Sequence, residues 1–255
     1  MKKVRINWNT TPFWHLNFAH RGLHDIKAGI PENSLAAFDA AAKAGYATEF
    51  DVRLTKDGTV VVFHDEFLKR MCGCEGRVID KTWDEIKDLK LAGTDQTIPR
   101  LEDVLRVLEK GKNIVILCEL KAVLDYKDLC VKTLELLRKY KGTFCIESFN
   151  PFIVRWFLKN APDVFRGQLA TGYKENKTLM NRVPAWIFAH CYLTFFNKPN
   201  FIAYRNAFKR PRHVLKYCRK KGKAMLVAWT SVEPDIDQEE NDAVIFEEYR
   251  PNNIY

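Results

Sequence analysis

Five side chains that can bind a metal ion or transfer a proton stand at or near the ends of apolar stretches of this chain. They are His20, Glu49, Asp51, His64 and Glu119. Carboxylate oxygens are hard ligands that suit Mg²⁺ or Ca²⁺, whereas zinc would favour histidine or cysteine. A lone histidine at a strand end is more often a hydrogen-bonded structural residue, but two beside three acidic residues favour acid–base catalysis. The set predicts a divalent-metal site with two proton-transfer groups.

Two cations accompany these groups, because Arg21 follows His20 directly and Lys121 lies two residues after Glu119. A phosphate group would satisfy both, through the guanidinium fork of the arginine and the ammonium group of the lysine. A metal ion, two cations and two histidines together indicate phosphoryl-group cleavage with a general acid and a general base.

The elements that must position these residues begin with a hairpin over residues 48–65. Charged and apolar residues alternate over 49–54 with the period of a strand that has two unlike faces. Asp57-Gly58 predicts a two-residue turn, since glycine accepts the positive φ that such a loop needs. Counting back from this turn, Asp51 faces His64, and a shift of one residue would turn the histidine away. The alternative interpretation is an exposed edge strand with its charges in water.

Eight strands, mostly separated by helices, are predicted once the return arm of the hairpin is left out. They cover residues 16–19, 49–54, 114–121, 144–149, 165–169, 201–204, 224–229 and 243–246. This alternation predicts an α/β fold in which a parallel sheet closes into a TIM-type (β/α)₈ barrel. An open doubly wound sheet is the alternative. In a barrel, functional residues lie where strands end, as the five residues above do.

Length and charge restrict the other possibilities. A chain of 255 residues with 47% hydrophobic and 29% charged residues fits a single globular domain over 1–255. The net charge of +9 suits anionic substrates or surfaces. We expect no nucleic-acid binding, because the basic residues are dispersed and no nucleic-acid-binding motif accompanies them.

Cysteine usage and hydropathy indicate the compartment. Seven irregularly spaced cysteines predict reduced thiols in a cytoplasmic protein. Polar residues over 7–15 interrupt any signal-peptide core, and no apolar run reaches the length of a membrane span.

Several motifs of the chain resemble the signature of the glycerophosphodiester phosphodiesterase family. They are His20-Arg21-Gly22, Pro31-Glu32-Asn33-Ser34, Glu49-x-Asp51 through Asp57-Gly58, His64-Asp65, Glu119-Leu120-Lys121 and Trp229-Thr230. The resemblance spans nearly the whole chain. It implies a (β/α)₈ barrel with a small hairpin extension after strand two. It also implies metal-dependent hydrolysis of a small-molecule glycerophosphodiester to an alcohol and glycerol 3-phosphate.

The resemblance also implies roles for individual residues. Glu49, Asp51 and Glu119 would hold Mg²⁺ or Ca²⁺, and the two histidines would act as acid and base. The substrate would be held by Arg21, Lys121, Glu32, Asn33 and Trp229. Trp229 could form a wall of the pocket for the leaving alcohol, or it could simply pack in the barrel mouth, and the sequence favours neither.

The chain departs from the family pattern towards its C-terminus. Ser231-Val232 stands where the family usually has Val-Asn, and the connection 231–242 is short and acidic for a full helix. These departures affect the expected alcohol more than the expected reaction. Lysophospholipase D-type hydrolysis of lysophospholipids, or a non-catalytic barrel that binds phosphodiesters or membranes, remain alternatives.

Residues 183–196 are unusually aromatic within a helix predicted over 176–196. The simpler interpretation is a helix that covers its strand. The alternative is peripheral membrane contact, because Trp, Tyr and Phe suit the lipid interface and a basic helix follows at 209–221.

Overall fold

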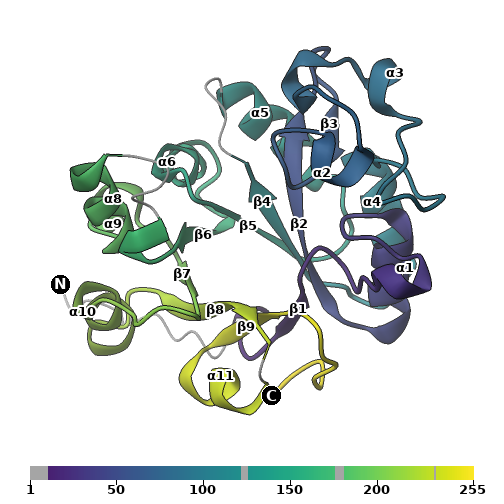
Figure 1. The fold of residues 1–255 in the computed structure, drawn as a ribbon. Coiled ribbons are helices and arrows are strands. Elements are labelled where there is room, and N and C mark those ends of the chain that lie inside the picture. The colour runs from purple at the N-terminus through teal and green to yellow at the C-terminus, as the bar shows by residue number, and fades with distance from the viewer. Residues whose placement is uncertain (1–10, 122–125, 176–180, 233) are drawn as a thin grey trace. The chain divides into compact units, whose positions relative to one another are not determined.

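The computed structural model describes residues 11–121, 126–175, 181–232 and 234–255 (Figure 1). These residues form two compact units, one covering Phe18–Phe144 and the other covering the described residues up to Asn17 together with those from Cys145 onwards. Each unit follows the alternation of strand and helix that the sequence predicts.

The first unit contains the predicted hairpin. Strand β1 (Asn17–Ala19) and β4 (Ile116–Leu120) pair in parallel with β2 (Ala47–Leu54), and β3 (Val60–Val62) returns antiparallel to β2. The helices α1 (Leu35–Ala44), α4 (Leu101–Leu108) and α5 (Tyr126–Leu137) pack beside these strands (Figure 1). Ser34 caps α1 through its hydroxyl, which accepts from the amide of Ala37, and Gly45 ends the helix at φ +74°.

The segment after β3 has its own small core. It contains α2 (Lys69–Cys72), the 3₁₀ turn η3 (Val78–Asp80) and α3 (Trp83–Ile86). Their buried side chains form one cluster that includes Phe63, Leu68 and Ile98. This packing fixes the chain that follows His64, and the local core thereby supports a candidate functional residue.

The second unit holds five parallel strands. These are β5 (Phe144–Ser148), β6 (Phe165–Ala170), β7 (Phe201–Arg205), β8 (Met225–Ser231) and β9 (Ala243–Phe246), each paired with the next along the chain. The helical segments between them are α6 (Pro151–Asn160), α8 (Arg182–Ala189), α9 (Thr194–Asn197), α10 (Arg212–Leu215), η4 (Lys216–Lys220) and α11 (Pro234–Glu240). In the described part of the chain, eight parallel strands plus the extra β3 give the strand order of a (β/α)₈ barrel. The predicted fold class is confirmed.

The hairpin pairs one residue away from the predicted register. Val52 faces Val62, and the amide of Phe63 donates to the carbonyl of Asp51 at 2.9 Å, so the prediction that Asp51 faces His64 is wrong. The turn is wider than two residues because the Thr55 hydroxyl donates to Asp57 and accepts from the amide of Thr59. These side-chain bonds stabilise the longer loop.

The single helix predicted over 176–196 is also wrong within the described residues. Helix α8 ends at Ala189, and Cys191 takes the left-handed conformation at φ +52° before α9 begins at Thr194. A positive φ cannot continue a right-handed helix. Residues 176–180 lie outside the described part. The short connection near the C-terminus holds the seven-residue α11.

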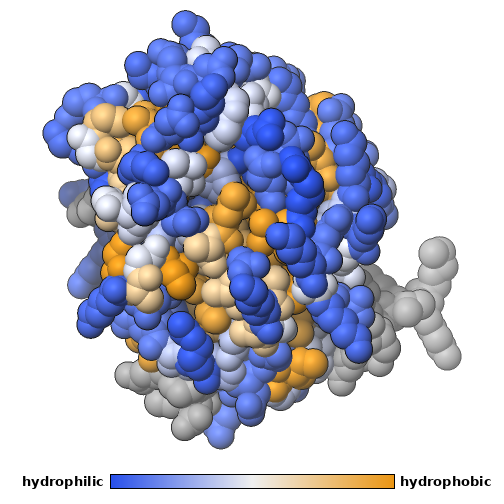
Figure 2. All heavy atoms as spheres, turned by 90° about the vertical axis from the view of Figure 1, so that its right-hand side faces the viewer, coloured by the Kyte–Doolittle hydropathy of each residue, from blue (hydrophilic) through white to orange (hydrophobic). Residues whose placement is uncertain are grey.

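One face of the molecule carries both hydrophilic and hydrophobic residues. On the face in Figure 2, hydrophilic residues cover most of the area and hydrophobic ones gather near its middle. No helix in the described ranges is long and apolar enough to cross a bilayer.

Candidate active site

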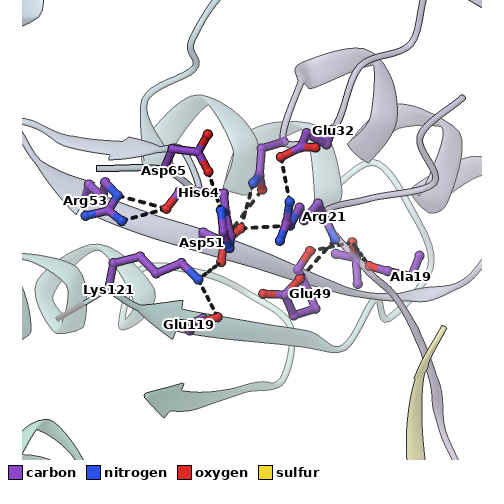
Figure 3. Close-up of polar contacts among 12 residues, drawn as sticks. Ala19, Arg21, Glu32, Glu49, Asp51, Arg53, His64, Asp65, Glu119 and Lys121 are labelled. Carbon is purple, nitrogen blue, oxygen red and sulfur yellow. Dashed lines mark hydrogen bonds and ion pairs between the residues drawn. The ribbon is translucent and has the colours of Figure 1, made fainter. Parts of the chain in front are cut away.

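Three buried carboxylates lie on neighbouring strands of the first unit. Glu49 and Asp51 are two residues apart on β2, so they share a face, and Asp51 stands beside Glu119 of β4 in the parallel register. One carboxylate oxygen of Glu49 and one of Glu119 lie within 4.8 Å of each other. Figure 3 shows the three side chains with the cations around them. The structure therefore brings together the acidic residues selected from the sequence.

The Lys121 ammonium group lies between two of these carboxylates. Its Nζ is 2.8 Å from Asp51 Oδ1 and 2.8 Å from Glu119 Oε2 (Figure 3). Asp51 Oδ2 accepts a hydrogen bond of 2.8 Å from Asn33 Nδ2 and lies 3.5 Å from Arg21 Nε. Asp51 thus has cations or donors at both oxygens.

Glu49 and Glu119 have fewer partners. Glu49 Oε2 accepts from the backbone amide of Arg21 at 3.0 Å. Among the described residues, the buried Glu119 Oε1 has no hydrogen-bond partner. Mg²⁺ and Ca²⁺ prefer oxygen ligands, and a buried carboxylate oxygen that accepts no hydrogen bond is available as such a ligand. The residues present therefore fit a hard divalent cation.

The pKa values of these groups follow from burial and neighbouring charge. Burial raises the pKa of Glu49 well above its usual value, and Asp51 and Glu119 raise it further. Burial also raises the pKa of Glu119 to about 7, although Lys121 opposes the shift. Burial would raise the pKa of Asp51 too, but Lys121, His64 and Arg21 hold it well below its usual range. Asp51 is therefore the strongest acid of the three, and the two glutamates bind protons more tightly.

His64 lies just beyond β3, where the chain has left the sheet. Its backbone carbonyl accepts from Arg53 Nε at 3.0 Å and from Nη2 at 2.7 Å, and its ring Nδ1 is 2.6 Å from Asp65 Oδ1 (Figure 3). Although the register differs from the predicted one, the imidazole lies near enough to Asp51 for their charges to interact. The predicted pairing of Asp51 with His64 is therefore wrong, and the catalytic role of His64 stays a prediction.

The environment of His64 favours the neutral ring. Burial, together with Lys121 and Arg21, lowers the pKa of His64 to about 4, although the charge of Asp51 and the bond to Asp65 oppose the shift. An ionised Asp65 can only accept a hydrogen bond, so Nδ1 carries the hydrogen and Nε2 keeps its lone pair. A neutral imidazole with a free Nε2 can act as a general base.

The remaining predicted residues of the first unit are placed by tight turns. His20 follows β1 and is half-buried, and Arg21 takes φ +53° directly after it. Arg21 Nη1 donates to Glu32 Oε1 at 2.8 Å. Asn33 is buried at φ +55° and turns its amide to Asp51. Glu32 and Asn33 thus hold side chains of the site.

Trp229 belongs to the other unit. Its indole N–H donates to the carbonyls of Ala170 and Ala203, and its ring packs edge-on against Phe149. These contacts show that the indole ring is packed against its neighbours. A role of Trp229 in binding the substrate stays a prediction.

Three charged residues of note were not selected from the sequence. Arg53 shares the face of β2 with Asp51 two residues earlier, a signal that the strand period contained. Glu147 is buried one residue before the end of β5, the position that Glu119 has in β4. Arg70 was not selected because one of its partners, Glu32, lies 38 residues away, although the other, Asp65, is only five residues before it.

The chain is similar in sequence to several known proteins. The model of the family described as "Glycerophosphoryl diester phosphodiesterase family" matches residues 20–249. A glycerophosphodiester phosphodiesterase of Caldanaerobacter subterraneus is 37% identical over 166 residues, which are 60% of this chain and 66% of that protein. The protein YqiK of Bacillus subtilis, described as uncharacterized, is 37% identical over 164 residues, again 60% of this chain and 66% of that protein. The matches span slightly less than two thirds of these relatives.

Solved structures show the same fold over more of the chain. A phosphodiesterase of Oleispira antarctica, solved in complex with the product sn-glycerol-3-phosphate, superposes with a TM-score of 0.73 at 22% identity, covering 92% of this chain and 93% of that one. A glycerophosphodiester phosphodiesterase of Thermotoga maritima gives a TM-score of 0.67 at 26% identity, covering 91% and 93%.

Proposed function

Since this chain belongs to the glycerophosphoryl diester phosphodiesterase family, we propose that it hydrolyses glycerophosphodiesters to an alcohol and glycerol 3-phosphate. One observation carries the proposal: the buried carboxylates of Glu49, Asp51 and Glu119 lie beside the cationic residues Arg21 and Lys121. The solved Oleispira antarctica phosphodiesterase contains sn-glycerol-3-phosphate as its product, which supports a substrate of this class.

Glu49 and Glu119, with Asp51 beside them, would hold Mg²⁺ or Ca²⁺. The bound cation would relieve the repulsion among the carboxylates and stabilise charge on the non-bridging phosphate oxygens. The guanidinium group of Arg21 would bind the phosphate from the same side. Lys121 keeps Asp51 ionised through its contact of 2.8 Å, and its ammonium group is the second candidate for the phosphate.

His64 would act as base and His20 as acid. Neutral His64 would remove a proton through Nε2, while Asp65 keeps its Nδ1 hydrogen in place. The proton would come either from the glycerol hydroxyl beside the ester, giving a cyclic phosphate that water opens, or from water directly. His20 would protonate the leaving alcohol in both routes.

Turnover of a panel of glycerophosphodiesters and lysophospholipids, with Mg²⁺, with Ca²⁺ and with EDTA, tests the function when the released phosphomonoester is detected. We expect turnover of at least one glycerophosphodiester with a divalent ion. Absence of turnover with every substrate and ion would favour the non-catalytic binding barrel. A substrate without the vicinal hydroxyl that reacts as fast as its parent would exclude the cyclic route.

A second candidate activity, on lysophospholipids at a membrane surface, rests on exposed aromatic residues. Trp186 is 48% exposed and Phe195 is 75% exposed, so neither is buried in a core. Aromatic side chains at a surface suit the lipid interface, and basic residues of α10 and η4 follow along the chain. A location in the cytoplasm stays a prediction, which rests on the number and irregular spacing of the seven cysteines.

Replacement of both aromatic residues tests this candidate. Trp186→Ser with Phe195→Ser should reduce lysophospholipid turnover more than glycerophosphocholine turnover, and should weaken binding to anionic vesicles. The matched control is Val131→Ser, which removes an exposed hydrophobic residue from α5. Equal loss for both substrates would contradict lipid contact through 183–196.

A further inference from the structure

Arg70 joins two carboxylates on either side of the candidate site. It lies on α2, and its side chain is 47% exposed. Its Nε and Nη2 donate to Asp65 Oδ2 and Oδ1 at 2.5 and 3.1 Å. Its Nη1 and Nη2 donate to Glu32 Oε2 and Oε1 at 3.0 and 2.7 Å. One guanidinium group thus makes a two-bond contact with each of two carboxylates.

Each of these carboxylates holds a residue that the proposed reaction uses. Asp65 Oδ1 is 2.6 Å from the ring Nδ1 of His64. Glu32 Oε1 accepts from Arg21 Nη1 at 2.8 Å, and Arg21 in turn lies 3.5 Å from Asp51. A continuous chain of contacts therefore runs from the imidazole through Arg70 to the guanidinium group of Arg21.

We propose that Arg70 is a positioning residue, which holds Asp65 and Glu32 so that the His64 ring and the Arg21 side chain keep their places at a bound phosphodiester. The inference rests on the proposed function. Arg70 contacts carboxylates that contact the reacting groups, so it acts through them.

The geometry requires arginine. A planar fork can direct four hydrogen bonds to two carboxylates at once, whereas the single ammonium group of lysine is a point charge. The side chains of Asp65 and Glu32 are both more than three-quarters buried. Loss of the Arg70 guanidinium group would therefore leave two neighbouring buried carboxylates without the cation that they share. We expect Asp65 to leave the imidazole, and a displacement of about 1 Å at a reacting group can lower the rate by about 10²-fold.

The primary test compares Arg70→Ala, Arg70→Lys and a matched control, Arg77→Ala. Arg77 is 44% exposed, lies in the same segment and pairs with Asp80 and Glu66 instead. We expect Arg70→Ala to lower kcat/KM about 10²-fold and Arg70→Lys to recover only a small part. Arg77→Ala should change it by less than about twofold, since an exposed ion pair contributes little. Equal effects of Arg70→Ala and Arg77→Ala would overturn the proposal, as would full activity of Arg70→Lys.

Double-variant cycles separate the contact of Arg70 with Asp65 from its contact with Glu32. Combined with Asp65→Asn, Arg70→Ala should add little further loss in kcat, and combined with Glu32→Gln it should add little further rise in KM. Additive losses in both cycles would show that Arg70 acts independently of these carboxylates, and would overturn the proposal.

A measurement without turnover separates positioning from general loss of structure. In protein labelled with ¹⁵N-histidine, the His64 signals are identified by their absence in His64→Gln. The wild type should show the tautomer with hydrogen on Nδ1, and Arg70→Ala should show less of it while Arg77→Ala should not. Unchanged His64 signals in Arg70→Ala would overturn the inference. If the wild type turns over no glycerophosphodiester, the proposed function fails, and this NMR comparison still decides whether Arg70 orients His64.

Discussion

Replacing Glu119 by glutamine should stabilise the metal-free protein, and more strongly at high pH. The pKa of Glu119 rises from 4.5 to about 7 on folding, because the carboxyl is buried near Asp51. The native state therefore binds this proton more tightly than the unfolded chain does. Between those two values, raising the pH lowers the stability of the native state. Glutamine resembles the protonated acid and removes this dependence.

The magnitude follows from the size of the shift. The shift corresponds to about 3 kcal/mol once Glu119 is ionised in both states, at roughly 1.4 kcal/mol per pKa unit. At about pH 5.5 the wild type has lost only part of these roughly 3 kcal/mol of stability. The difference in free energy of unfolding between Glu119→Gln and the wild type should therefore grow by roughly 2 kcal/mol between about pH 5.5 and about pH 8. His64 contributes with the opposite sign, because its pKa falls from 6.5 to about 4. That contribution is common to both proteins and cancels in their difference.

Thermal unfolding of both proteins in EDTA at the two pH values measures the effect. A change of roughly 2 kcal/mol corresponds to about 4–8 °C in Tm for a protein of this size. Glu135→Gln on α5 is the control, because it removes an exposed carboxylate and should give no comparable pH-dependent gain. A difference between wild type and Glu119→Gln that stays constant from about pH 5.5 to about pH 8 would refute the reasoning.

Three further predictions concern the proposed reaction. Glu49→Gln should abolish the turnover that Mg²⁺ or Ca²⁺ restores when either ion is titrated into EDTA-treated protein. Full activity of the wild type in excess EDTA would contradict the metal site. His20→Ala and His64→Ala should each lower kcat/KM by roughly 10²- to 10⁴-fold, and the double variant by much less than their product. Their pairing also predicts a bell-shaped pH profile, and near-wild-type kcat/KM in either variant would contradict it. Arg53→Met removes both donors to the His64 carbonyl and should lower kcat by about 10²-fold with KM nearly unchanged; an unchanged kcat would show that the backbone of His64 needs no such support.

The sequence by itself determined the order of strands and helices and the chemical types gathered at strand ends. Glu49 and Asp51 share a face because side chains alternate along any strand. Glu119 belongs near them because parallel strands of one barrel end on the same side. These inferences use the periodicity of side chains and the order of strands and helices, which can be read from short stretches of sequence. They were enough to predict the fold class and the three neighbouring carboxylates.

Tertiary structure decided which charges pair. Lys121 was predicted to hold phosphate, and in the structure its ammonium group lies between Asp51 and Glu119. Arg70 is 38 residues from Glu32 in sequence, and no local pattern marks their contact. The partner of a buried charge depends on every other charge within the same low-dielectric space, so it cannot be read from any one segment.

The hairpin shows the same limit at short range. Asp57-Gly58 indicated a turn correctly, but the hydroxyl of Thr55 accepted a bond from Thr59 and moved the pairing by one residue. The chain leaves the sheet after Val62, and Arg53 donates to the carbonyl of His64 there. The sequence supplied the residues of the candidate site. Packing and side-chain hydrogen bonds set their distances and pKa values, because those depend on groups that only the folded chain brings together.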